Sequence, residues 1–147
     1  MRKKHERPLN QSRTPSFLII LCLVLGGCSS DWDIQMNNLR DDPLATTKWP
    51  ELELLGIDQS TQKGHKPTSP RITRCYKRSI GIEEAFEKVI GTAKQNDWIE
   101  DSMVKSPDTR VARKKIGESK ATLLITSQKN RCTMYSSSDF VITIGYL

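Results

Sequence analysis

The sequence predicts an α+β fold: a small β-α-β-β-β domain in which one helix packs on an antiparallel sheet, after a flexible N-terminal tether. Three observations predict it. An amphipathic helix pattern lies in the second half of the chain, strand-like segments flank it, and a short glycine-containing connection joins two of these segments. With 147 residues, the chain has room for one domain. We expect this domain to occupy residues 71–147.

The first strand is expected over residues 72–77, which mix β-branched, aromatic and basic side chains. The helix comes next. Its apolar residues recur at intervals of three and four and therefore share one face, and its acidic residues cluster in the first turns, where they complement the helix dipole. The apolar face consists of Ile82, Ala85, Phe86, Val89, Ile90 and Ala93. We expect Asn96 to end the helix as a left-handed residue.

Three extended segments are expected after the helix. Residues 109–116 and 120–128 are separated by Gly117-Glu118-Ser119, which is typical of a hairpin connection. Residues 139–147 are rich in aromatic and β-branched side chains. The helix would cover one face of this meander, with Trp98 at the edge of the interface as a core residue rather than a ligand-binding one.

Residues 28–70 are predicted to form the N-terminus of the mature protein and a mostly flexible spacer. Their polar, proline-containing stretches show no sustained apolar period. Residues 49–55 alternate briefly in polarity, which favours either a short edge strand or a segment that docks on the main domain.

An uncharged apolar run spans residues 17–25 and is preceded by a basic segment with Arg2, Lys3, Lys4, Arg7 and Arg13. A transmembrane helix needs about 20 apolar residues, whereas a shorter run behind positive charge is typical of a secretory signal. We therefore predict a signal peptide over residues 1–27, and export of the chain from residue 28 onward.

Leu25-Gly26-Gly27-Cys28 resembles the lipobox of bacterial lipoproteins. The resemblance implies cleavage before Cys28, a diacylglyceryl thioether on its sulfur and acylation of the freed amine. Two or more acyl chains would anchor the protein to the extracytoplasmic side of the cell membrane, or to an outer membrane if the cell has one. The alternative is an unmodified cysteine after a conventional signal. Cys22 lies inside the apolar run and lacks small residues before it.

The order of features after the lipobox resembles small uncharacterised lipoproteins of Gram-positive actinobacteria. It comprises an acidic-Pro-Leu-Ala segment at residues 42–45, an aromatic residue, a spacer, a basic strand and an amphipathic helix ending in a tryptophan. This resemblance implies no activity.

Two cysteines remain after processing, Cys75 and Cys132. Thiols outside the cell usually pair, so a disulfide is possible, and two separate buried thiols are the alternative. The mature chain has no Cys-x-x-Cys pair, and its sole histidine, His65, lies in the spacer. We therefore predict no metal and no cofactor.

The sequence also predicts a protein that is not an enzyme. His65 lies beside Gly64 and Pro67 in the predicted spacer, where a general base is hard to hold in place. No phosphate-binding loop, nucleophile elbow or zinc motif is present.

Basic residues cluster over 63–78 and 110–120. Residues 1–27 carry five of the 23 Lys/Arg and one of the 17 Asp/Glu, so the mature chain has a net charge of only +2, and we expect no nucleic-acid partner. If the two groups lie side by side, they form a patch for anionic lipid headgroups or an anionic envelope polymer; the alternative is an ordinary solvated face. The candidate contacts are Arg74, Lys77, Arg78, Arg110, Arg113, Lys114 and Lys115.

These observations leave two functions. The first is a non-catalytic, membrane-anchored module that binds or scaffolds another protein of the cell envelope. The second is a binder of anionic polymer or lipid through the two basic groups.

Overall fold

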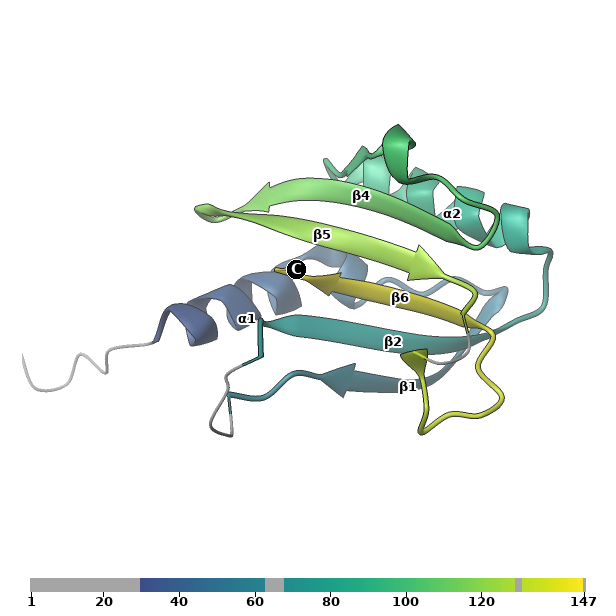
Figure 1. Ribbon diagram of the computed structural model, residues 1–147, viewed down its shortest axis with the longest axis horizontal. Helices are drawn as coiled ribbons and strands as arrows, with labels where there is room; N and C mark the ends of the chain where they lie inside the picture. The colour runs from purple at the N-terminus through teal and green to yellow at the C-terminus, as the bar shows by residue number, and fades with distance from the viewer. Residues whose placement is uncertain (1–29, 63–67, 129–130, 147) are drawn as a thin grey trace, which may run out of the picture.

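The computed structural model describes residues 30–62, 68–128 and 131–146. Within these ranges the chain forms a six-stranded antiparallel sheet with two α-helices on one face (Figure 1). The expected α+β class is therefore confirmed. The strands are β1 (Leu52–Gln59), β2 (Arg71–Arg78), β3 (Ile99–Glu100), β4 (Thr109–Ile116), β5 (Ser119–Thr126) and β6 (Phe140–Gly145). The helices are α1 (Asp31–Asp41) and α2 (Ile82–Gln95), with 3-10 turns η1 (Pro43–Ala45) and η2 (Ser102–Val104).

The sheet order is β1-β2-β6-β5-β4-β3. The exact β-α-β-β-β topology is not confirmed, although β2, α2, β4, β5 and β6 follow one another in that chain order. The structure also has α1 and β3, which were not predicted from the sequence, and β1 extends beyond the segment proposed for it. The last strand, β6, lies between β2 and β5, and all six of its residues are buried. Strand β2 pairs with both β1 and β6 and is therefore an interior strand.

The prediction of a mostly flexible spacer over residues 28–70 is wrong for residues 31–59, which fold as α1, η1 and β1. Ser30 caps α1 by accepting a hydrogen bond from the Asp33 amide at 3.2 Å. Met36, Leu39 and Leu44 are fully buried. The apolar residues of this segment come singly, each in a different turn, so they produce no regular period although each enters the core. The domain begins at α1 rather than at residue 71.

Strand β1 is an edge strand, one of the two alternatives for residues 49–55, and it continues to Gln59. It pairs with β2 and is interrupted by an irregularity between Leu54 and Gly56. The ring of Tyr135 packs directly on Gly56, where a Cβ atom would overlap it. A glycine is needed here because no side chain fits beneath the ring.

The main core lies between the two helices and the sheet, and the apolar stripe of α2 faces it as predicted. Phe86 of α2 packs against Phe140 of β6, with ring centroids 5.5 Å apart. Trp98 is 2% exposed, so it lies inside this core rather than at its edge.

The end of α2 differs from the expectation by one residue. Asn96 has φ −112°, and the left-handed residue is Asp97, with φ 65°. The Asn96 side chain instead turns back, and its Nδ2 donates to the Thr92 carbonyl at 2.8 Å. The β4–β5 hairpin is likewise one residue tighter: Ile116 pairs with Ser119, and Gly117 has φ 60° in a two-residue turn.

Candidate functional site

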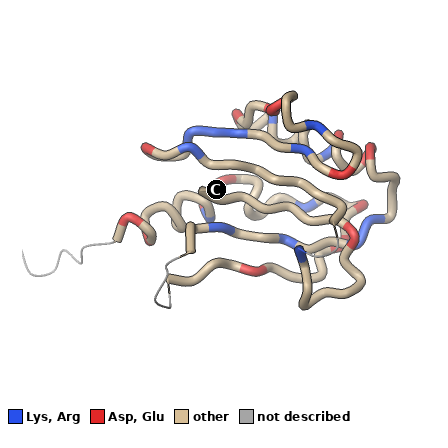
Figure 2. The backbone as a smooth tube through the Cα atoms, viewed as in Figure 1, with Lys and Arg blue, Asp and Glu red and all other residues tan. Residues whose placement is uncertain are grey.

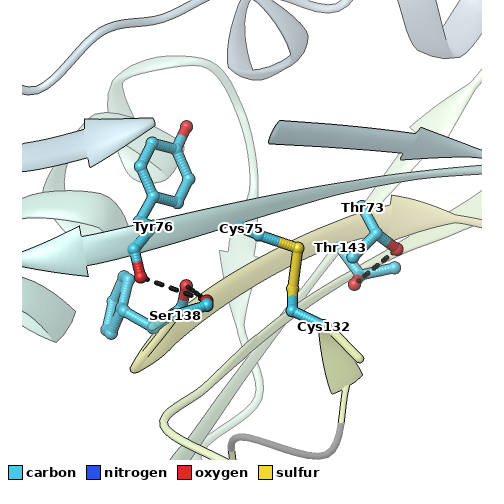
Figure 3. The surroundings of a disulfide bond; sticks show 7 residues. Thr73, Cys75, Tyr76, Cys132, Ser138 and Thr143 are labelled. Carbon is cyan, nitrogen blue, oxygen red and sulfur yellow. Dashed lines mark hydrogen bonds between the residues drawn. A yellow bond between two sulfur atoms is a disulfide. The ribbon is translucent and has the colours of Figure 1, made fainter. Parts of the chain in front are cut away.

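The two cysteines of the domain form a disulfide (Figure 3). Cys75 lies on β2 and Cys132 in the β5–β6 connection, with their Cα atoms 6.0 Å apart. Together with Val141 they form a second small core on the sheet face opposite the helices. Ser138 donates to the Tyr76 carbonyl at 3.1 Å, so the connection is held to β2 at two places. Of the two alternatives for Cys75 and Cys132, the disulfide is thus confirmed.

The two basic groups do not lie side by side in the described part of the chain, so the condition for a single basic patch is not met there. Strands β2 and β4, which carry its two halves, are separated by β6 and β5 (Figure 2). Two of the proposed contact residues also face inward, because Arg74 is 4% exposed and Arg110 is 3% exposed. Both project from the sheet toward the helix-covered core rather than toward solvent. Successive residues of a strand point to opposite faces of the sheet, so basic residues that are close together in the sequence are divided between the core and the solvent.

Arg110 has a structural role. Its Nη2 lies 2.7 Å from Glu83 Oε2, and its guanidinium lies over the Phe86 ring at 4.5 Å. It also donates to the carbonyls of Ser106 and Thr109. These contacts join β4 to the first turn of α2.

Lys114 also points inward and pairs with a buried carboxylate. Its Nζ lies 2.9 Å from Asp42 Oδ2. The other oxygen, Asp42 Oδ1, accepts from the Leu44 amide at 3.0 Å and from Trp98 Nε1 at 3.4 Å. Asp42 therefore ties the end of α1 to η1, to β4 and to the tryptophan just beyond α2.

The other proposed contact residues each lie near an acidic side chain. Lys77 Nζ lies 3.5 Å from Asp139 Oδ2, and Arg78 Nε lies 3.5 Å from Asp139 Oδ1. Arg113 lies 3.1 Å from Asp101, and Lys115 lies 3.5 Å from Glu118. On β4 each of the four proposed residues thus has an acidic partner of its own, whereas on β2 Lys77 and Arg78 share one carboxylate. Cys28, His65, Lys63 and Lys66 lie outside the described residues.

A pocket of about 290 Å³ lies beside the β1 edge, and we call it the Arg74 pocket. It is lined by Lys48, Trp49, Pro50, Leu52, Leu54, Arg74 and Tyr76. Strands β1 and β2 supply one side, and the segment that leads from η1 into β1 supplies the other. This pocket was not predicted from the sequence, because the Trp49 segment was assigned to the spacer and Arg74 to the surface.

Arg74 is held in the pocket by one end of its guanidinium. Nη1 donates to the Leu44 carbonyl at 2.9 Å and to the Thr47 carbonyl at 2.8 Å. Nε is buried without a hydrogen-bond partner, and none of the described acidic side chains forms an ion pair with Arg74. Burial lowers the pKa of Arg74, but an arginine stays charged in proteins. The pocket thus contains a positive charge that no described carboxylate balances.

Tyr76 contributes a second unused donor. Its hydroxyl is buried and has no hydrogen-bond partner in the described part of the chain. Burial raises the pKa of Tyr76 to about 12, so the phenol keeps its proton at neutral pH. The Tyr76 ring lies against the Arg74 guanidinium at 5.3 Å and makes an edge contact with Trp49, with centroids 6.1 Å apart. The phenol points away from the disulfide (Figure 3).

A larger hollow of about 470 Å³ lies where β3 meets β4. Its lining is of mixed charge, and Arg113 and Asp101 on its wall pair with each other. The Arg74 pocket differs because its buried charge has no such partner. Among the described residues, no group of three or more His, Cys, Asp or Glu side chains is arranged to hold a metal.

Comparison with protein-family models, with curated proteins and with solved structures found no match. In the described part of the chain, no helix is both long enough and apolar enough to cross a bilayer. The lipobox and the resemblance to actinobacterial lipoproteins therefore stay predictions from the sequence.

Proposed function

We propose that this chain is an extracytoplasmic bacterial lipoprotein. Residues 1–27 are its signal peptide, Cys28 carries the lipid, and the α+β domain is a non-catalytic module that binds another protein of the cell envelope. The observation that carries the proposal is the disulfide between Cys75 and Cys132. Disulfides persist in oxidising compartments and are rare in the cytosol of most cells. The domain thus supports export independently of the leader sequence.

The position of α1 sets how the domain would sit. Only one residue separates Cys28 from Ser30, the cap of α1. Since an extended chain spans at most about 3.6 Å per residue, Ser30 would lie within about 7 Å of the lipidated residue, and Asp31, the first residue of α1, within about 11 Å. The protein would therefore work close to the bilayer surface, not at the end of the long tether that the sequence predicted.

The protein-binding alternative is favoured over the anionic-polymer alternative by the surface that the domain presents. The basic residues proposed for polymer binding are divided between two strands and are buried or lie near acids. The β1 edge, in contrast, exposes Leu54 at 41% and Ile57 at 46% beside the Arg74 pocket. Apolar side chains next to an edge strand are common features of protein-interaction sites.

The test is acylation of the full chain in a lipoprotein-processing bacterium, measured by incorporation of an alkyne-tagged fatty acid, by intact mass and by membrane fractionation. We expect a membrane-bound, labelled product that begins at residue 28. Cys28→Ser should abolish labelling. Cys22→Ser is the matched control and should leave labelling unchanged. A wild-type protein that stays unacylated with residues 1–27 attached would refute the proposal.

A further inference from the structure

We infer that the Arg74 pocket binds a carboxylate carried on a compact apolar group. This inference names the ligand chemistry of the proposed binding module. It rests on the proposed function only for the cell compartment in which the protein meets its ligand. The ligand is identified by its chemistry alone. The C-terminal carboxylate of a partner polypeptide and a small free carboxylic acid share that chemistry.

The unused edge of the Arg74 guanidinium selects the carboxylate. Nη1 is oriented by the carbonyls of Leu44 and Thr47. Nε has no partner, and no hydrogen bond joins Nη2 to any described residue. Nε–H and Nη2–H point in parallel from one edge of the guanidinium, and they match the two oxygens of a carboxylate. Because a buried, uncompensated charge is costly, an anion bound there would remove an existing penalty.

The Tyr76 hydroxyl is a second unused donor, on a residue that also lines the Arg74 pocket. It is buried without a partner among the described residues and stays protonated at neutral pH, so it can donate to an anion. The hydroxyl and the guanidinium come from alternate residues of β2, Tyr76 and Arg74, which place both on the same face of the strand. Two polar side chains with unused donors therefore share one face of β2, and the guanidinium of one lies 5.3 Å from the ring centroid of the other.

The walls of the pocket select the rest of the ligand. Trp49, Pro50, Leu52 and Leu54 are apolar, and Leu54 is half exposed at the rim. A volume of about 290 Å³ is near the lower limit of pockets that hold small molecules, roughly 300 Å³. The pocket thus fits a branched aliphatic group of the size of a leucine side chain. A bare inorganic anion would leave these walls without a partner.

The experiment is calorimetric titration of the full chain, purified from membranes in mild detergent, with two matched pairs of probes. N-acetylleucine and its amide represent a chain terminus. 4-Methylpentanoate and its amide represent a free acid. We expect each acid that binds to do so at least about tenfold more tightly than its amide, since a charge-assisted bond is lost in the amide. Binding of only the first acid identifies a polypeptide terminus, and equal binding of both identifies the carboxylate alone as sufficient.

Tyr76→Phe is the decisive variant because it removes only the unpaired hydroxyl and leaves the ring in place. We expect it to fold and to bind the acid about fivefold more weakly. Tyr135→Phe, whose ring packs on Gly56 outside the pocket, is the matched control and should bind as the wild type does. The inference is overturned if neither acid binds, if acid and amide bind equally, or if the two variants behave alike.

Failure of this inference is distinguishable from failure of the proposed function. Titration of the Cys28→Ser chain measures the pocket without a lipid, and fatty-acid labelling measures the lipid without the pocket. Acid binding without labelling would refute only the location of the protein. Labelling without acid binding would refute only the ligand.

Discussion

Breaking the Cys75–Cys132 disulfide should lower the free energy of unfolding by about 4 kcal/mol. The bridge joins residues separated by 57 positions, and the chain-entropy relation for a closed loop of this length yields that figure at 25 °C. The loop encloses α2, β3, β4 and β5, so the bridge restricts most of the domain in the unfolded state. Small domains are stable by roughly 5–15 kcal/mol in total, and the loss would therefore be a large share.

Urea unfolding monitored by tryptophan fluorescence is the assay, since Trp49 and Trp98 are both buried. The oxidised protein should be compared with the same protein after reduction, which removes the cross-link but keeps both sulfur atoms in place. The Cys75→Ala/Cys132→Ala variant should lose somewhat more, because it also removes packing around Val141. Equal midpoints for the oxidised and reduced forms would refute the loop-entropy reasoning.

Three further predictions concern the core. Gly56→Ala should destabilise the protein by about 1–3 kcal/mol because the new methyl group displaces the Tyr135 ring. Gly91→Ala is the control in α2, where nothing lies near the Cβ position, and it should stabilise the protein by about 0.5–1 kcal/mol. A loss of stability at Gly91 as large as at Gly56 would contradict this prediction. Asp42→Asn should cost about 3 kcal/mol in urea unfolding by leaving Lys114 without its carboxylate, while Glu118→Gln, at an exposed pair, should cost almost nothing. Burial raises the pKa of Tyr76 to about 12 from an ordinary 10. The stability that comes from keeping this phenol protonated is therefore present below pH 10, and roughly 2–3 kcal/mol of it is lost as the pH rises from 10 to 12. Tyr76→Phe should abolish this alkaline loss, and a variant with the same pH profile as the wild type would show that Tyr76 is not its source.

The sequence predicted the elements that have regular periods. The stripe of α2 was recognisable because one face of the helix is buried, and β4, β5 and β6 were recognisable from the glycine-containing hairpin connection and from their β-branched and aromatic residues. The segment of α1 and η1 was not recognisable, since Met36, Leu39 and Leu44 contribute one buried residue per turn and their partners lie far away in the chain. No local pattern reports such contacts.

The interpretation of the basic residues failed for a related reason. Arg74 and Arg110 occupy inward-facing positions of β2 and β4, where a hydrophobic residue would normally mark the buried face. Each is accommodated by backbone carbonyls and an aromatic ring, and such a pocket arises only from tertiary structure. The pairing of Cys75 with Cys132, in contrast, was one of two alternatives that the sequence left open, because only these two cysteines remain once Cys22 and Cys28 are assigned to the leader and to the lipid.

The two errors have one physical origin, which is the packing of the segment after α1 against β2. Arg74 is buried because the Leu44 and Thr47 carbonyls accept its Nη1 hydrogen bonds, and these carbonyls belong to the segment that continues from α1. The same segment supplies Trp49 to the pocket wall. A ligand bound at Arg74 would therefore stabilise the docking of the whole segment against β2, because binding to the folded state alone raises its stability.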